Sequence, residues 1–217
     1  MITRVLLVDD HELMRQGLRS ILERDETVLV VGEAASGREA VELATTLAPD
    51  VVVMDVAMKE LNGIDATRQI RAACPAVKVI ALSSHSDSRY VSAILDAGAC
   101  GYVLKANAYD DLRRGIEAAR QGKNYLCADV TQAVVSAALR GTGAASDLVH
   151  ASLSAREREV LQLLAEGLSS PQIGKRLFIA TATVESHRRN VMRKLGLHSV
   201  ADLTKYAVRE GLTALDA

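Results

Sequence analysis

The sequence predicts an α/β fold built on a parallel sheet, followed by a small all-α domain. Short aliphatic runs alternate with stretches of helical spacing through the first half of the chain, and these runs lack the polar alternation of solvent-facing strands. The last third shows helical spacing only. With 217 residues and 49% hydrophobic content, the chain is long enough for two domains with buried cores.

Five aliphatic runs mark the strands of the predicted sheet, and a helical stretch follows each of them. The strands are expected at residues 5–8, 28–31, 51–55, 79–82 and 102–104. Because crossovers between parallel strands are right-handed, the natural strand order is 2-1-3-4-5, which is the flavodoxin-like topology. Gly122 ends this block, so the first domain is expected to span residues 1–122.

Capping signals place the helices between these strands. Ser36 and Glu39 have the spacing of a capping box, and Asn62-Gly63 is a turn signal before the third helix. Asp87 and Asn107 are expected to cap the fourth and fifth helices. Five strand–helix pairs result.

Reactive side chains follow four of the predicted strands. Asp9-Asp10, Asp55, Ser83 and Lys105 each stand at a strand's carboxyl end, where open α/β sheets bind their ligands. Clustered carboxylates repel one another unless a cation lies between them, and a water-rich oxygen site suits Mg²⁺. An aspartate beside Mg²⁺ can attack phosphorus to give an acyl phosphate, while a hydroxyl and an ammonium hold the phosphoryl oxygens.

At these residues the first half of the chain resembles the receiver domain of two-component response regulators. The resemblance implies a role for seven positions: Asp55 as phosphoacceptor, Asp9, Asp10 and the backbone carbonyl of Ala57 as partners of Asp55 in a Mg²⁺ site, Ser83 and Lys105 as phosphate ligands, and Tyr102 as a rotating aromatic switch. Lys59 stands where the family usually has proline, so the loop after Asp55 lacks a fixed φ angle.

Residues 123–148 are expected to form a linker with one short helix, and residues 149–217 a second domain. The small-residue run 141–146 is the flexible part of this linker. In the second domain, a Ser154–Glu157 capping box opens the first helix, and Pro171 is expected at the first position of the next.

A longer helix from about residue 181 to 195 follows a tight turn, which is the plan of a helix-turn-helix. Gly196 ends this helix, and Ser199 is expected to cap the last one. Lysine and arginine outnumber acidic residues between Arg188 and Lys194, which favours a helix that contacts nucleic acid over one that is merely solvated.

This half of the chain resembles the LuxR-type helix-turn-helix through Arg156 to Leu161, Thr183-Val184 and Lys194-Leu195-Gly196. With the receiver ahead of it, the whole chain resembles a response regulator of the NarL/FixJ group. The expected DNA contacts are Glu185, Ser186 and Arg189 toward the bases or groove, Arg188, Asn190, Arg193 and Lys194 toward the backbone, and Thr183 beside them.

Two departures from the LuxR-type pattern affect the long helix. Ala180 replaces a usual serine at its start, so the cap is lost unless Thr181 supplies it. Glu185 replaces a common lysine, and a carboxylate accepts from cytosine instead of binding phosphate.

Composition excludes several other classes of protein. Cys74, Cys100 and Cys127 are dispersed, the five histidines show no metal-ligand spacing, and no apolar run approaches the ~18 residues that span a bilayer. These features predict a cytoplasmic protein with reduced thiols and no membrane contact. The net charge of -1 conceals a basic second domain, with 10 Lys+Arg against 7 Asp+Glu in residues 151–217.

The resulting hypothesis is a DNA-binding transcription regulator and not an enzyme. A partner sensor histidine kinase or a small phosphodonor phosphorylates Asp55 with Mg²⁺, and phosphorylation gates dimerisation and binding to double-stranded promoter DNA. One alternative is a Mg²⁺-dependent phosphohydrolase, although Val56 and Ala57 cannot serve as its general acid or base. Another is a regulator that binds DNA without phosphorylation.

Overall fold

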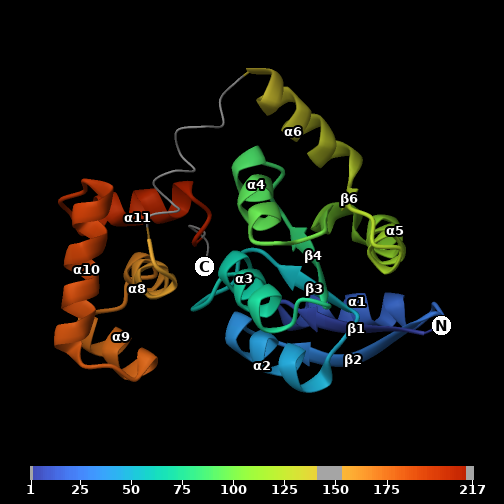
Figure 1. The fold of residues 1–217 in the computed structure, drawn as a ribbon, viewed down its shortest axis with the longest axis horizontal. Helices are drawn as coiled ribbons and strands as arrows, with labels where there is room; N and C mark the ends of the chain where they lie inside the picture. Colours follow the sequence, from blue (N-terminus) through green and yellow to red (C-terminus); the bar gives the residue numbers. More distant parts are fainter. Residues whose placement is uncertain (1, 141–152, 214–217) are drawn as a thin grey trace. The chain divides into compact units, whose positions relative to one another are not determined.

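The computed structural model describes residues 2–140 and 153–213. The chain divides into two compact units, residues 1–136 and residues 137–217 (Figure 1). The first contains a parallel sheet with helices, and the second contains helices only among its described residues. No helix in the described ranges is both long enough and apolar enough to cross a bilayer.

The sheet of the first unit has the strand order β2-β1-β3-β4-β5-β6, and every neighbouring pair is parallel. Its strands are β1 (Thr3–Val8), β2 (Val28–Ala34), β3 (Val51–Asp55), β4 (Lys78–Ser83), β5 (Gly101–Leu104) and β6 (Tyr125–Leu126). The first five confirm the flavodoxin-like order. The prediction of five strands is corrected by a sixth, β6, which follows Gly122 in the chain and pairs with β5. Its two residues are too few to show a hydrophobic period.

The helices of the first unit follow the strands in the expected alternation. They are α1 (Glu12–Leu22), α2 (Gly37–Leu47), α3 (Gly63–Ala73), α4 (Ser88–Asp96) and α5 (Ala108–Arg120), with a 3-10 turn, η1 (Lys105–Asn107), before α5. A further helix, α6 (Ala128–Arg140), begins in this unit and ends beyond its boundary at residue 136.

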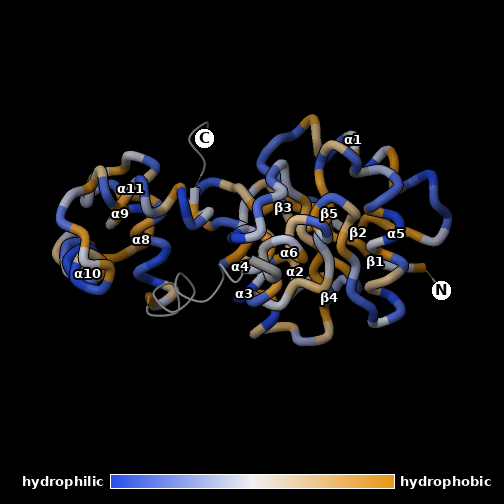
Figure 2. The backbone as a smooth tube through the Cα atoms, turned by 90° about the horizontal axis from the view of Figure 1, so that it is seen from above, coloured by the Kyte–Doolittle hydropathy of each residue, from blue (hydrophilic) through white to orange (hydrophobic). Residues whose placement is uncertain are grey.

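Helices cover both faces of this sheet. Alternate residues of β3 point to opposite sides, so Val52 and Met54 join a core with α2, α3 and α4, whereas Val51 and Val53 join a core with α1 and α5. All five residues of β3 are buried, as expected for a central strand without polar alternation. Figure 2 shows the hydrophobic strand segments gathered inside this unit.

Side chains cap three of the helices in the first unit. Ser36 accepts a hydrogen bond from the Glu39 amide, and Asn62 and Asp87 cap α3 and α4 in the same way. Asn107 does not cap α5 with its side chain, which corrects the prediction. The turn η1 leads directly into α5, and Asn107 therefore has φ -118° and ψ 25° instead of the extended backbone of a capping residue.

The short helix predicted within the linker is α6, and its first half belongs to the core of the first unit. Val130 is buried there together with Cys127, the residue before the helix, and Val134 packs against the same cluster. The expected flexible run 141–146 lies outside the described residues.

The second unit contains α8 (Ala155–Ala165), α9 (Ser170–Leu177), α10 (Thr181–Leu195) and α11 (Val200–Arg209). They enclose a core that includes Leu161, Ile173, Val184, Val191 and Leu203. The Ser154–Glu157 capping box is present in both directions. Gly196, with φ 64°, ends α10 in the left-handed conformation.

Two details of helix starts in the second unit differ from expectation. Helix α9 begins at Ser170 with Ser169 as its N-cap, so Pro171 occupies the second helical position instead of the first. Helix α10 begins after Ala180, and no side chain caps it; Thr181 is already helical and does not replace the missing serine.

Candidate functional site

The register of the parallel strands brings the predicted reactive residues to one edge of the sheet. Val8 pairs with Met54, so Asp9 and Asp55 follow side by side on β1 and β3. Asp55 pairs with Leu82, and Ser83 pairs with Leu104. Each of the four strands therefore ends within one residue of its neighbour, and the side chains that follow share one rim.

Asp55 is the centre of this rim and is only 2% exposed. Its Oδ2 accepts a hydrogen bond from Nζ of Lys105 at 2.8 Å, and its Oδ1 accepts one from the amide of Ala57 at 3.3 Å. The same Lys105 ammonium lies 2.7 Å from Oδ2 of Asp9, which is also buried. Lys105 thus bridges two carboxylates from different strands.

The close approach of α3 to Asp55 requires glycine at position 63. A Cβ atom at Gly63 would lie 1.9 Å from the carbonyl oxygen of Asp55, which no side chain allows. The amide of Gly63 also donates to the carbonyl of Val56 at 2.9 Å. The Asn62-Gly63 signal therefore both starts α3 and lets the loop after Asp55 fold back.

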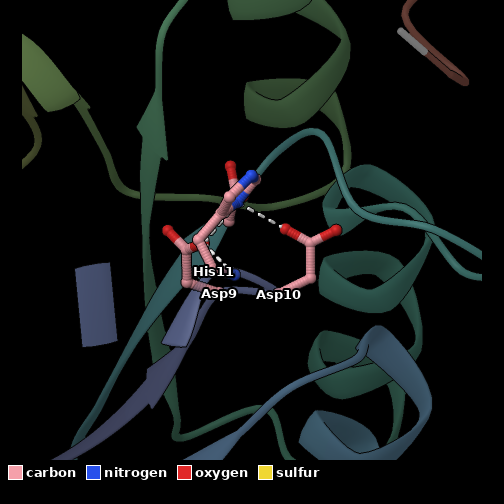
Figure 3. Close-up of side chains that lie close together, drawn as sticks. Asp9, Asp10 and His11 are labelled. Atoms are coloured by element: carbon pink, nitrogen blue, oxygen red, sulfur yellow. Dashed lines mark hydrogen bonds and ion pairs between the residues drawn. The ribbon is translucent and has the colours of Figure 1, made fainter. Parts of the chain in front are cut away.

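Asp10 and His11 complete the acidic cluster (Figure 3). Nδ1 of His11 lies 2.8 Å from Oδ1 of Asp10 and 3.2 Å from Oδ1 of Asp9, so the imidazole lies between the two acids. One ligand atom each from Asp9, Asp10, His11 and Asp55 fall within 4.8 Å of one another. Sequence reasoning missed His11, because histidine spacing alone carries no signal; its place directly after the acid pair was the available clue.

The electrostatics of the cluster favour a bound cation. Burial raises the pKa of Asp55 to about 6; Lys105 opposes this rise, and the nearby charge of Asp9 adds to it. Burial alone would lower the pKa of Lys105, but Asp55 and Asp9 raise it overall, so its ammonium stays charged. Three carboxylates gather in this cluster, and the one ammonium, Lys105, contacts two of them; a divalent ion would neutralise the excess negative charge.

Ser83 and Tyr102 meet at the backbone of His85. Ser83 is buried, and its hydroxyl accepts a hydrogen bond from the His85 amide at 3.0 Å. The Tyr102 ring is fully buried, and its hydroxyl donates to the His85 carbonyl at 2.6 Å. Burial raises the pKa of Tyr102, which keeps this donor protonated. The His85 ring stacks on Tyr90 with centroids 5.0 Å apart.

The loop that carries Lys59 makes a tight turn without proline. The Leu61 amide donates to the Lys59 carbonyl at 2.9 Å, and Glu60 between them has φ 71°. Lys59 itself is exposed. The turn thus places the unusual φ at Glu60 and leaves Lys59 as a solvated charge.

The predicted nucleic-acid contacts all lie on α10. Thr183, Ser186, Arg189 and Arg193 are exposed, and Arg193 donates to the half-buried Asn190 at 3.1 Å.

The other three also have charged or hydrogen-bonded partners within the second unit. Lys194 lies 2.7 Å from Oε2 of Glu157 on α8. Glu185 accepts a hydrogen bond from the Ser170 hydroxyl of α9, and Arg188 lies 3.8 Å from Glu185.

Comparison with known proteins identifies the family of both units. Residues 5–117 match the response regulator receiver domain, and residues 151–207 match the luxR family of bacterial regulatory proteins. The chain belongs to the LuxR-type response regulators. This response regulator is a DNA-binding transcription regulator of the NarL/FixJ group, as its receiver, its helix-turn-helix unit and its relatives show.

Two relatives match this chain over nearly their whole length. The response regulator is 41% identical over 209 residues to the transcriptional regulatory protein LiaR of Bacillus subtilis, a match that covers 96% of this chain and 98% of LiaR. It is 36% identical to the response regulator UvrY of Escherichia coli K12, with 96% of this chain and 94% of UvrY covered.

Solved structures of RcsB also match nearly the whole of this chain. RcsB of Salmonella typhimurium is 30% identical, with a TM-score of 0.60, and the match covers 96% of this response regulator and 99% of that chain. An RcsB–DNA complex matches with 29% identity and a TM-score of 0.60, covering 97% of this chain and 99% of the other.

Proposed function

We propose that Asp55 is the phosphoacceptor of this response regulator, and that a partner histidine kinase or a small phosphodonor supplies the phosphoryl group. A carboxylate oxygen of Asp55 attacks phosphorus, a P–O bond forms, and the bond to the donor breaks with its electron pair on the leaving group. The observation that carries this proposal is the bridge from Lys105 to both Asp55 and Asp9, buried at the rim of the sheet.

The donor set fits Mg²⁺, with Asp9, Asp10, Asp55 and the carbonyl of Ala57 as its holders. Bound Mg²⁺ would neutralise charge on the carboxylates and the phosphoryl oxygens. Lys105 is placed to move from the carboxylates to a phosphoryl oxygen, because its ammonium already contacts Asp55 at 2.8 Å. The His11 imidazole lies between Asp9 and Asp10, so it would have to turn aside for the ion to bind there. Its side chain is 72% exposed, which leaves room for this movement.

Signal transmission is proposed to run through Ser83 and Tyr102. A phosphoryl group adds about -1.5 to -2 charge and attracts the Ser83 hydroxyl. Since Ser83 and Tyr102 bond to the amide and the carbonyl of His85, a shift of Ser83 alters the loop that holds Tyr102. The Tyr102 ring is already buried. Phosphorylation is therefore proposed to change the loop contact that holds this ring, and with it the surface around α4.

The output is proposed to be the binding of α10 in the major groove of double-stranded DNA as a homodimer. The exposed residues Ser186 and Arg189 are suited to reach bases, and Arg193, Asn190 and Arg188 to contact phosphates. Lys194 is the least suited of the set, because its ammonium already neutralises Glu157. Phosphorylation-gated dimerisation places two copies of α10 on successive half-sites.

Phosphorylation of purified full-length variants tests the input. Incubation with acetyl phosphate and Mg²⁺ should give base-labile phosphate on the wild type and on Asp110→Asn, an exposed control, and none on Asp55→Asn. Phosphate uptake by Asp55→Asn equal to that of the wild type would refute the assignment.

DNA affinity with and without acetyl phosphate tests the gate. Phosphorylation should tighten binding of the wild type and leave Asp55→Asn unchanged. Equal wild-type affinity in both states would instead establish a regulator that works without phosphorylation, and rapid multiple turnover of a phosphomonoester would establish a phosphohydrolase.

A further inference from the structure

A contact between the two helices of the helix-turn-helix involves a residue that no sequence pattern singled out. Ser170, the first residue of α9, is 8% exposed, and its hydroxyl donates a hydrogen bond to Oε1 of Glu185 on α10. The side chain of Glu185 is 42% exposed. One carboxylate oxygen therefore bonds to a buried donor, while the side chain as a whole still reaches solvent.

The second oxygen of Glu185 has a looser partner. Nη1 of Arg188, one turn along α10, lies 3.8 Å from Oε2. This separation is longer than a hydrogen bond, so Arg188 balances the charge of Glu185 without fixing Oε2. Ser170, Glu185 and Arg188 also line an open hollow of 540 Å³, so the group lies within reach of a ligand.

The chemistry of this arrangement selects one kind of DNA group. An ionised carboxylate only accepts hydrogen bonds, so it is repelled by phosphates and by base acceptors such as N7 and O6 of guanine. In the major groove its complement is an exocyclic amino group, and N4 of cytosine is the usual partner of glutamate. A charge-assisted bond from a buried hydroxyl holds the carboxylate in one orientation.

We infer that Ser170 is a positioning residue that orients Glu185 to read the amino group of a cytosine, with Arg188 released to a phosphate when the duplex binds. The inference rests on the proposed role of α10 as the DNA-reading helix. On binding, Oε2 exchanges the arginine for the cytosine amino group, and the arginine exchanges the carboxylate for a phosphate. The Glu185 carboxylate and the Arg188 guanidinium therefore each have a partner both before and after the duplex binds.

Selection from a randomised duplex DNA library, with the full-length chain, acetyl phosphate and Mg²⁺, tests this inference. The wild type should enrich cytosine at one position, and Glu185→Gln should replace it by adenine, because an amide reads adenine. Ser170→Ala should lower the cytosine preference at that position by about tenfold, the equivalent of one hydrogen bond to a charged group, and leave other positions unchanged.

Two further variants separate positioning from simple stabilisation. Ser170→Thr keeps the hydroxyl and should restore the cytosine preference. Ser169→Ala is the matched control: this neighbouring serine caps α9 and bonds to Gln172, so its loss lowers stability without changing the base preference. Thermal unfolding of each variant reports stability independently of specificity.

Three results would overturn the inference. Ser170→Ala with the base preferences of the wild type would make the contact a helix–helix tie only. Glu185→Gln that selects the same sequences as the wild type would remove Glu185 as a reader. A phosphorylated wild type that enriches no DNA sequence would instead overturn the proposed function of α10, and this inference with it.

Discussion

The Lys194 ammonium lies 2.7 Å from Oε2 of Glu157, which joins the last turn of α10 to the first turn of α8. Glu157 is 5% exposed, and the same Oε2 accepts a hydrogen bond from the Ser154 amide at 2.8 Å. Burial would raise the pKa of Glu157, but the bonds from Lys194 and Ser154 outweigh it and lower the pKa overall. Lys194 therefore stabilises a buried carboxylate within its own unit.

Replacement of Lys194 by methionine should destabilise the second unit and leave the salt dependence of DNA binding unchanged. The expected loss is about 1.5–3 kcal/mol, typical of a hydrogen bond to a charged group. Hydrogen exchange of peptides from α8 and α10 in the full-length chain measures the loss. Lys205→Met removes the same charge from an exposed site of α11 and is the control. A salt slope reduced by about one in Lys194→Met alone would show that this residue contacts phosphate after all.

The stability of the first unit should fall as pH rises from about 4 to 6 in metal-free buffer. Because the pKa of Asp55 is raised to about 6, the folded state holds this proton more tightly than the unfolded chain, and stability from this group is lost as pH rises through the folded pKa. Asp55→Asn should remove that fall and gain up to about 3 kcal/mol at pH 7. Hydrogen exchange of β3 peptides, followed against pH, measures the stability of the wild type and of Asp55→Asn. Parallel pH profiles of the two proteins would contradict the raised pKa of Asp55.

Most of the fold and the central site could be predicted because they depend on local pattern. An unbroken aliphatic run such as residues 51–54 requires a strand covered on both faces, and parallel strands end at the same rim. The positions of Asp9, Asp55 and Lys105 follow from those two facts, and their contacts are those that a shared rim allows.

The features that could not be predicted depend on partners distant in sequence. Neither Lys194 nor Ser170 carries any local sign of the carboxylate it contacts, since Glu157 lies on another helix and Glu185 lies across a turn. β6 is fixed by hydrogen bonds to β5 and not by a period of its own. Asn107 fails as a cap because the preceding 3-10 turn determines its backbone.

Substitution of Lys105 by methionine should impair phosphorylation without preventing Mg²⁺ binding. The loss of one positioned donor to the phosphoryl oxygens is expected to slow uptake from acetyl phosphate on the order of 10²-fold. The pKa of Asp55 should also rise further, because Lys105 opposes the rise more strongly than the Ala57 amide does. Phosphate incorporation measured against pH reports both effects. Lys123→Met, an exposed lysine next to β6, is the control, and uptake in Lys105→Met at the wild-type rate would contradict a role in phosphate binding.

Restoring a capping hydroxyl at the start of α10 should stabilise the second unit. Ala180 occupies the N-cap with extended backbone (φ -64°, ψ 145°) and offers no side-chain acceptor to the first amides of the helix. Ala180→Ser supplies that acceptor without changing the backbone, and a gain of about 1 kcal/mol in the free energy of unfolding is expected. Ala182→Ser places the same hydroxyl on an exposed position inside the helix, where serine is slightly unfavourable, and should give no gain. Urea unfolding of both variants measures the change in the free energy of unfolding. An equal effect of the two serines would show that a side-chain cap at position 180 does not stabilise the helix.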